Sequence, residues 1–290
     1  TGDVDGSKTT YSTELTVNSN QSYTISEANT AGYTEGTWSC TNDAQAIAVA
    51  EGLTKNVTLN EGDTVTCEIT NNDQAPFLTV LKSITGNNGG LLMPSDFDLY
   101  VGDTQVNHDE QNSFDADTYE ISEVQQDGYL FTGVLGDCAY DEEEDVITIG
   151  LQIGNTYSCT LVNEEIAPKL TLRKEVTNDD GGTATASEWT LSATPDKNSV
   201  GAEVVSGNGS DGVTSEPVKA NVTYTLDEYD GPDGYSEGSW DCGEANLDGN
   251  ILSMDLAEEV TCTITNDDIA PEITVVKTVY GDRDREFDFN

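Results

Sequence analysis

Hydrophobic and polar residues alternate along many short segments of the chain, and this period of two is typical of β-strands. The segment FLTVLKSI (77–84) carries its aliphatic residues at alternate positions, and KLTLRKEV (169–176) and EITVVKTV (272–279) repeat the pattern. Val, Ile, Thr and Tyr are frequent in such segments, and Gly, Asn and Asp separate them. The pattern therefore predicts an all-β protein.

Longer matches show that these segments belong to a repeat with a period of about 100 residues, which favours tandem immunoglobulin-like β-sandwich domains. Each match joins a strand, a short Asn- and Pro-containing stretch and a second strand: VTCEITNNDQAPFLTVLKSI (65–84), YSCTLVNEEIAPKLTLRKEV (157–176) and VTCTITNDDIAPEITVVKTV (260–279). We expect four parts: 1–74, a domain that lacks its first strand; 75–166 and 167–269, two complete domains; and 270–290, the first strand of a next repeat or a donor strand for the 1–74 domain of a neighbouring copy.

The stretches NNDQAP, NEEIAP and NDDIAP are the predicted joints between domains. Each one is too short for a flexible linker, and its proline holds the preceding residue extended. The sequence therefore predicts domains that follow one another in a stiff rod.

The composition is strongly acidic, with 55 Asp and Glu against 11 Lys and Arg and a formal net charge of −44. Nucleic acid and anionic membrane surfaces are excluded as partners, because binding phosphate groups requires clustered Lys and Arg. No apolar run approaches the ~20 residues of a membrane span. A solvated, self-repelling surface explains the acidity best, and we expect no cofactor. Calcium binding by TNDDGGT (177–183) or DEEED (141–145) stays open, although neither has the spacing of a dedicated calcium loop.

The six cysteines fall two to a repeat, which predicts one disulfide within each domain and an oxidising, extracellular or cell-surface location. The absence of CxxC pairs and neighbouring histidines argues against zinc. The predicted pairs are Cys40–Cys67, Cys138–Cys159 and Cys242–Cys262.

Charged and amide side chains share the inward faces of these strands. By parity, each strand of the FLTVLKSI type directs a lysine inward, the strand before each joint directs an asparagine inward, and YTISE (23–27), YEISE (119–123) and YTLDE (224–228) each direct a glutamate inward. The residues concerned are Lys82, Lys174 and Lys277; Asn71, Asn163 and Asn266; and Glu27, Glu123 and Glu228.

Three interpretations of these residues stay open. A buried Lys–Glu ion pair with a hydrogen-bonded asparagine is one, and side chains reaching water from strand ends is another. The third is chemical, because burial pushes lysine toward its nucleophilic neutral amine and a glutamic acid toward its protonated form. The amine can then attack the asparagine carboxamide, which releases ammonia and leaves a neutral amide crosslink.

The lysine strand, the YxLxE box and the last strand ending in Asn resemble those of the CnaB-type, or prealbumin-like (SpaA-like), domains of bacterial surface adhesins and pilins. The resemblance covers essentially the whole chain and implies self-generated isopeptide bonds: Lys82–Asn163 promoted by Glu123, and Lys174–Asn266 promoted by Glu228. The family's PxGY tail survives only in GPDGY (231–235). A disulfide beside the crosslink strand is not general in the family, so disulfides that replace the isopeptides are an alternative.

The two ends of the chain complement each other in sequence. Residues 1–74 contain Glu27 and Asn71 but no lysine-bearing first strand, and residues 270–290 contain that strand with Lys277. Either the sequence is a window from a longer repetitive chain, or copies polymerise head-to-tail by strand addition. Both alternatives predict that Lys277 meets Asn71 and Glu27 of a neighbouring copy.

These features predict a structural repeat of an extracellular filament, pilus or adhesin stalk that binds copies of itself and is not an enzyme. The single histidine, His108, lies in the polar stretch VNHDEQ, and no catalytic motif is present. The alternative is an adhesin module that binds a carbohydrate or a surface protein through Trp38, Trp189 or Trp240. An exposed tryptophan would favour that alternative, and buried tryptophans would favour the stalk.

Overall fold

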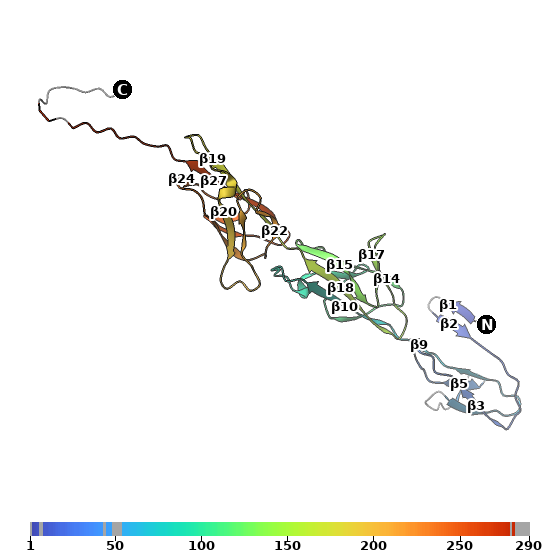
Figure 1. The fold of residues 1–290 in the computed structure, drawn as a ribbon. Coiled ribbons are helices and arrows are strands. Elements are labelled where there is room, and N and C mark those ends of the chain that lie inside the picture. Colours follow the sequence, from blue (N-terminus) through green and yellow to red (C-terminus); the bar gives the residue numbers. More distant parts are fainter. Residues whose placement is uncertain (1, 6–7, 43–44, 48–53, 279, 282–290) are drawn as a thin grey trace. The chain divides into compact units, whose positions relative to one another are not determined.

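The computed structural model describes residues 2–5, 8–42, 45–47, 54–278 and 280–281. In this part of the chain nearly all regular structure is β, which confirms the predicted fold class (Figure 1). Among the described residues, helical structure is limited to two 3-10 turns, η1 (Pro94–Asp96) and η2 (Ala186–Glu188). The chain forms two compact units, the first of residues 1–82, 98–124 and 134–161, and the second of residues 83–97, 125–133 and 162–290.

The second unit contains a β-sandwich of two sheets whose strands lie between residues 169 and 268. One sheet has the order β22-β19-β27-β24, and the other has the order β21-β20-β23-β26-β25. The first sheet comprises β19 (Lys169–Thr177), β22 (Val213–Pro217), β24 (Tyr235–Glu237) and β27 (Glu259–Asp268). The second comprises β20 (Thr190–Pro195), β21 (Val205–Asn208), β23 (Thr223–Tyr229), β25 (Asn246–Asp248) and β26 (Ile251–Ser253).

Between these sheets lies a core that the alternation predicts. The inward residues Leu170 and Leu172 of β19 and Cys262 and Ile264 of β27 are at most 1% exposed. β19 and β27 pair in parallel, with Lys174 opposite Ile264 and Val176 opposite Asn266. The first and last strands of this domain are therefore hydrogen-bonded neighbours.

A five-stranded sheet of the first unit has the order β12-β11-β14-β17-β16. Its strands are β11 (Leu99–Val101), β12 (Thr104–Val106), β14 (Thr118–Glu123), β16 (Ala139–Asp141) and β17 (Val146–Gly150). A four-stranded sheet has the order β13-β10-β18-β15, with β10 (Phe77–Thr85), β13 (Gln111–Ser113), β15 (Tyr129–Gly136) and β18 (Thr156–Glu165). The predicted domain boundaries at 74, 166 and 269 stay predictions.

Residues 1–74 form small sheets with few strands: β1-β2, β3-β7, β4-β9 and β6-β5-β8. Their strands are β1 (Gly2–Asp5), β2 (Lys8–Tyr11), β3 (Ser22–Ser26), β4 (Tyr33–Thr34), β5 (Ser39–Asn42), β6 (Gln45–Ile47), β7 (Thr54–Thr58), β8 (Val65–Glu68) and β9 (Asn72–Asp73). The inward residues Val65 and Cys67 of β8 are only half-buried. This region therefore has a less protected core than the sandwich of 167–269.

All three predicted disulfides are present, and each one connects residues of a single repeat. They join Cys40 to Cys67, Cys138 to Cys159 and Cys242 to Cys262. In the entropic account, each bridge stabilises the fold by about 3 kcal/mol because it restricts the unfolded chain.

The joints are hydrogen-bonded, as expected of stretches that leave no room for a flexible linker. The Gln74 N–H donates to the Gly32 carbonyl (2.8 Å), and the Gln74 carbonyl accepts from the Gly154 N–H (2.7 Å). Gln74 is thus hydrogen-bonded both to Gly32 in its own repeat and to Gly154 in the following repeat. At the next joint, the Ile166 N–H donates to the Gly128 carbonyl, and the Ile166 carbonyl accepts from the Ala257 N–H, both at 2.9 Å.

Residues 270–290 were expected to be the first strand of a next repeat or a donor strand for a neighbouring copy. The structure assigns no strand to residues 270–278, and residues 279 and 282–290 lie outside the described part of the chain. The side chains of Ile273 and Val275 are 89% and 62% exposed. The physical reason is that a strand requires hydrogen bonds to a neighbouring strand, and sequence alternation alone does not supply them. Within the described residues, no helix has the length and apolar character needed to cross a membrane.

Candidate functional site

The parity argument placed Lys82, Lys174 and Lys277 on inward strand faces. The structure confirms this placement for Lys82 and Lys174, whereas Lys277 is exposed. Lys82 of β10 is 3% exposed and Lys174 of β19 is 4% exposed, each in line with buried aliphatic residues of the same strand. A lone buried ammonium costs several kcal/mol, so each lysine requires a partner inside the sandwich.

In the domain of residues 167–269, that partner is Glu228 at the end of β23 in the facing sheet. The Lys174 Nζ donates to Glu228 Oε2 at 2.5 Å, and the side chains of the two residues are 0% and 5% exposed. The Asn266 Nδ2 of β27 donates to the second oxygen, Oε1, at 2.6 Å. One buried carboxyl group thus contacts both the amine and the carboxamide.

The carboxamide of Asn266 is held from one side only. The residue is 3% exposed, and in the described part of the chain its Oδ1 is buried without a hydrogen-bond partner. Such an oxygen retains its full desolvation cost, which is typically 1–3 kcal/mol. Buried amide oxygens are rarely left in this state for structural reasons alone.

The second repeat has the same ion pair. The Lys82 Nζ donates to Glu123 Oε2 at 2.5 Å, with side chains 0% and 8% exposed. Asn163 of β18 is fully buried. The single histidine contributes to the surroundings of the lysine, because the Lys82 backbone N–H donates to His108 Nδ1 at 2.9 Å. His108 lies in a turn between β12 and β13, as expected of a loop residue.

Burial changes the ionisation of both lysines. It lowers the pKa of Lys174 below its ordinary value, although the hydrogen bond and charge of Glu228 and the charge of Glu237 act in the opposite direction. Burial also outweighs the contribution of Glu123 and lowers the pKa of Lys82. The neutral, nucleophilic form of each amine is therefore more accessible than in water.

One aromatic ring lies over the amine of Lys174. Its Nζ lies 4.8 Å from the ring centroid of Trp189, and that ring packs edge-on against Tyr235 with a centroid distance of 5.3 Å. A cavity of about 210 Å³ borders Trp189, Tyr235, Glu228 and Asn266.

The tryptophans do not form an exposed binding surface. Trp38, Trp189 and Trp240 are 9%, 3% and 8% exposed, respectively. By the criterion set from the sequence, three buried tryptophans favour the stalk over the carbohydrate-binding module.

The first repeat has the acid and the amide in the same arrangement. The Asn71 Nδ2 donates to Glu27 Oε1 at 2.8 Å, and the Gly36 N–H donates to Asn71 Oδ1 at 3.2 Å. Glu27 Oε2 is buried and has no hydrogen-bond partner among the described residues. In the other two repeats, the corresponding Oε2 receives a lysine amine.

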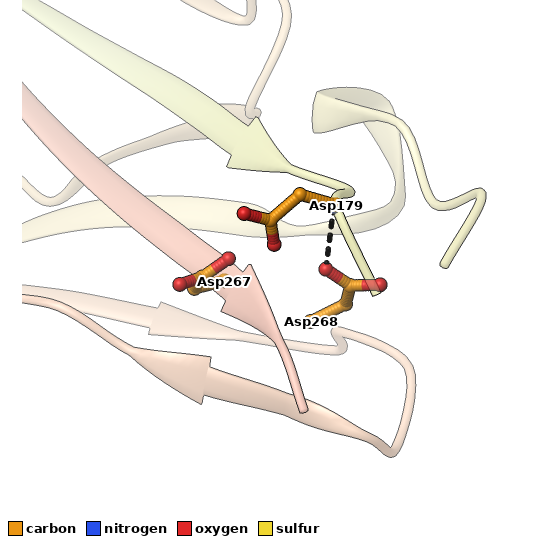
Figure 2. Close-up of side chains that lie close together, drawn as sticks. All are labelled: Asp179, Asp267 and Asp268. Atoms are coloured by element: carbon orange, nitrogen blue, oxygen red, sulfur yellow. Dashed lines mark hydrogen bonds between the residues drawn. The ribbon is translucent and has the colours of Figure 1, made fainter. Parts of the chain in front are cut away.

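An acidic corner lies where β19 and β27 end. Single carboxylate oxygens of Asp179, Asp267 and Asp268 lie within 4.8 Å of one another. Figure 2 shows Asp179 after the end of one strand and Asp267 and Asp268 at the end of the other, with the Asp179 backbone N–H bonded to Asp268. Both oxygens of Asp268 already accept backbone N–H groups. Asp268 is thus bonded to the loop, and calcium binding by residues 177–183 stays an untested prediction.

Three features of the site were missed in the sequence, although parity could have indicated two of them. Lys55 shares a strand face with Val57 and is 3% exposed, so the first repeat contains a buried lysine of its own. Asp268 shares a strand face with Asn266 and is 7% exposed. The contact of His108 with β10 carries no signal in the sequence, because it depends on how a loop folds back.

A family model described as a prealbumin-like fold domain, of the SpaA type, matches residues 1–69 and 165–264, which is more than half of the chain. Among curated proteins, none matches.

Several solved structures are similar at low identity. The Bacillus anthracis TIE protein shares 14% identity over 86% of this chain, with a TM-score of 0.43, and the chain spans about half (51%) of its length. A C-terminal fragment of the pilus adhesin SpaC from Lactobacillus rhamnosus GG shares 14% identity, with 69% and 100% of the two chains covered and a TM-score of 0.38. The major pilin from Streptococcus pyogenes shares 15%, with 68% and 99% covered and a TM-score of 0.29. With the β-sandwich and the family match together, the chain belongs to the SpaA-type family of prealbumin-like fold domains.

Proposed function

We propose that this chain is a structural segment of an extracellular, cell-surface filament, pilus or adhesin stalk, whose complete repeats are closed by self-generated Lys–Asn isopeptide bonds. The observation that carries the proposal is the buried contact of Glu228 with Lys174 on one oxygen and Asn266 on the other. The disulfides support the extracellular location, because such bonds persist in oxidising compartments.

The chemistry follows from these contacts. Lys174 transfers a proton to Glu228 and becomes a neutral amine, which burial favours. The amine Nζ attacks Asn266 Cγ, the new Nζ–Cγ bond forms, and the Cγ–Nδ2 bond breaks. Glu228 carries a proton from the attacking nitrogen to the departing Nδ2, which leaves as ammonia. The product amide is neutral, so the cost of burying a charged lysine disappears.

The position of the bond explains its mechanical value. Because β19 and β27 are the first and last strands of the domain and pair in parallel, tension applied at the two joints passes through them. A covalent Lys174–Asn266 bond carries that tension directly and spares residues 175–265. Lys82–Asn163 is expected to protect the preceding repeat in the same way, with Glu123 as the promoting acid.

Peptide mapping of the reduced, denatured chain tests the crosslinks. We expect joined peptides containing Lys174 with Asn266 and Lys82 with Asn163. The Lys174→Arg chain is the matched control, because it keeps a cation at the position and should lose only the first of these peptides. Unmodified Lys174 and Asn266 peptides in the wild-type chain would contradict the proposal and leave a buried ion pair.

Head-to-tail joining of copies is the second part of the proposed function. The first repeat presents the buried, unpartnered Glu27 Oε2 beside Asn71, and residues 270–278 carry exposed Ile273 and Val275. In the proposal, the tail of one copy adds to β8 of a neighbouring copy and brings Lys277 to Glu27, where a Lys277–Asn71 bond forms.

The two observed joints indicate how the tail would dock. The Gly154 N–H donates to the Gln74 carbonyl, and the Ala257 N–H donates to the Ile166 carbonyl. Both donors lie just before the last strand of their repeat and have positive φ, 74° and 60°. Gly62 occupies the same place in the first repeat with φ 84°. The Ile269 carbonyl of one copy is therefore expected to accept from the Gly62 N–H of the next.

Denaturing electrophoresis of the concentrated chain tests the joining. We expect a ladder that resists SDS and reducing agent, and that disappears in Lys277→Arg. Mapping of the ladder must show Lys277 joined to Asn71; a Lys55–Asn71 peptide would instead show that the first repeat closes on its own buried lysine. A single band for the wild-type chain at every concentration would contradict covalent head-to-tail joining.

A further inference from the structure

One carboxylate lies two residues beyond the asparagine of each complete repeat and binds the loop that follows the lysine strand. In the last repeat this residue is Asp268, which is 7% exposed. Its Oδ1 accepts from the Asp179 N–H at 2.9 Å, the bond drawn in Figure 2, and from the Asp180 N–H at 3.1 Å. Its Oδ2 accepts from the Asp180 N–H (3.0 Å) and the Gly182 N–H (2.6 Å). The loop is thereby fastened to the end of β27.

These bonds offset the cost of burying the charge. Burial by itself raises the pKa of Asp268, but the backbone N–H groups of Gly182, Asp180 and Asp179 outweigh it and lower the pKa below its ordinary value. Asp268 is therefore ionised at neutral pH, and charge-assisted bonds of this kind are stronger than neutral ones.

Glu165 makes the equivalent contact in the preceding repeat, two residues after Asn163. Its Oε2 accepts from the Asn88 N–H at 2.5 Å, and its backbone carbonyl accepts from Asn88 Nδ2 at 2.8 Å. Asn88 lies in the loop TGNNGG (85–90), which follows β10 as TNDDGG (177–182) follows β19. Two side chains of different length thus fasten matching loops.

The last glycine of each loop shows how closely the loop approaches the acid and the tyrosine. A Cβ on Gly182 would lie 2.8 Å from Asp268 Cβ and only 2.3 Å from Tyr235 Oη. A Cβ on Gly90 would lie 2.7 Å from Glu165 Oε1 and 2.4 Å from Tyr129 Oη. Only glycine fits at these positions, because any side chain would separate the loop from the acid.

The two tyrosines complete the same contact in both repeats. The Ala184 N–H donates to Tyr235 Oη at 2.9 Å, and the Leu92 N–H donates to Tyr129 Oη at 3.1 Å. An acid, a glycine and a tyrosine therefore make the same set of contacts with this loop in both repeats, with Asp268 as the acid in one and Glu165 in the other. Its recurrence indicates a role connected to what the repeats share.

Both repeats contain a buried lysine, and the lysine strand must pair with the asparagine strand in the correct register. Lys174 stands opposite Ile264, two positions before Val176, which stands opposite Asn266. A slip of one residue would turn Lys174 out of the core, because strand side chains alternate between faces. The loop held by Asp268 begins directly after β19, so fastening it fixes where β19 stops along β27.

We propose that Asp268 and Glu165 are positioning residues for crosslinking: each holds the lysine strand of its repeat in the register that brings the amine to the promoting glutamate and the asparagine. The proposal rests on the proposed isopeptide chemistry. Neither carboxylate enters the reaction; each acts through the loop after the lysine strand. Of the three acids drawn in Figure 2, only Asp268 accepts the backbone bonds that hold the loop.

Cell-free synthesis of the full chain, sampled over time, tests the proposal. The fraction of Lys174–Asn266 peptide is followed, with Lys82–Asn163 as the internal control in the same molecule. We expect Asp268→Ala to slow the first crosslink by about tenfold or more and to leave the second unchanged. Asp268→Glu should restore it nearly to the wild-type rate, because Glu165 is the natural form in the neighbouring repeat.

Asp267→Ala is the matched control for charge, since this exposed neighbour belongs to the same acidic corner but is not the anchor. It should leave the rate unchanged. A wild-type rate in Asp268→Ala, or equal slowing in Asp267→Ala, would overturn the proposal. If Asp268→Ala does not fold, Asp268→Asn replaces it: one acceptor oxygen remains, and an intermediate rate is expected, with a wild-type rate contradicting the proposal.

A second readout separates this proposal from the crosslink itself. In an Asn266→Ala chain no Lys174–Asn266 bond can form, and the buried Lys174 amine should resist an amine-reactive label. Adding Asp268→Ala should make Lys174 label at least about tenfold faster, whereas adding Asp267→Ala should not. Absence of crosslinks in the wild-type chain would sink the isopeptide chemistry alone; unchanged labelling would sink the positioning role.

Discussion

The first and the last repeat have the same pattern of inward residues but differ in how well they bury it. Val260, Cys262 and Ile264 of β27 are at most 5% exposed, whereas Val65, Cys67 and Ile69 at the same positions of the first repeat are half-buried. In the last repeat, β19 lies beside β27 and adds the buried Leu170 and Leu172 to the same core. The lysine strand therefore completes the core as well as supplying the amine.

The polar groups of the two repeats differ in the same way. Glu228 contacts Asn266 through Oε1 and Lys174 through Oε2, and Glu27 contacts Asn71 through Oε1 while its Oε2 has no partner in the described chain. The acid and the amide thus take up their arrangement without the lysine. What the lysine strand adds is the charge partner and, in the proposed function, the covalent bond.

Removing the glutamate should give the largest difference between the repeats. Glu228→Ala leaves Lys174 buried without its carboxylate, which costs about 3–5 kcal/mol, and it should also abolish the Lys174–Asn266 crosslink. Glu27→Ala should cost less than about 1 kcal/mol, because one of its oxygens has no partner. Urea unfolding followed by fluorescence of Trp240 and Trp38 reports on the two repeats. Similar losses at both sites would contradict the comparison.

Removing a disulfide should have the next largest effect, and its consequence should differ between repeats. Replacing Cys242 and Cys262 by alanine should cost roughly 3 kcal/mol, yet the crosslinked sandwich should stay folded. The same change at Cys40 and Cys67 should leave the first repeat unfolded, because its core is less buried. Limited proteolysis distinguishes the two variants: cleavage confined to residues 1–74 is expected only when Cys40 and Cys67 are replaced.

A smaller effect concerns pH and is expected only where the crosslink is prevented. In Asn266→Ala, Lys174 keeps a folded-state pKa below its ordinary value of 10.5. Between the lowered pKa and 10.5 the unfolded chain binds more protons, so stability should rise with pH in that window. In the crosslinked wild-type repeat, Lys174 no longer titrates. Urea unfolding of both chains from neutral to alkaline pH tests this, and identical slopes would indicate that the wild-type lysine is unreacted.

The smallest effect should come from an exposed ion pair on the same strand. Lys169 Nζ lies 3.2 Å from Glu259 Oε1, and the side chains are 51% and 74% exposed. Solvent screening and lost side-chain freedom limit such pairs to about 0–1 kcal/mol. Lys169→Ala should therefore change the unfolding free energy by less than about 1 kcal/mol. A loss comparable to that of Glu228→Ala would show that burial does not control the strength of these pairs.

Alternation in the sequence was sufficient to place Lys82, Lys174 and Glu228 inside the sandwich, because burial of one strand face fixes every second residue. The cysteine pairs followed from the repeat in the same way. The anchoring by Asp268 could not be predicted, since parity shows that a residue points inward but not which loop meets it. The tail at 270–290 was predicted as a strand from its match to the other lysine strands, and without a neighbouring strand the structure assigns none to residues 270–278.

The central claim is that the complete repeats are covalently closed, and the mass of the reduced, denatured 290-residue chain tests it most directly. Each isopeptide bond removes one ammonia from the chain. The account predicts a wild-type mass below that of the sequence by two ammonia molecules, and by one in Lys174→Arg or Glu228→Ala, after allowing for the substitution itself. A wild-type mass equal to that of the sequence would contradict it, leaving disulfides as the covalent links.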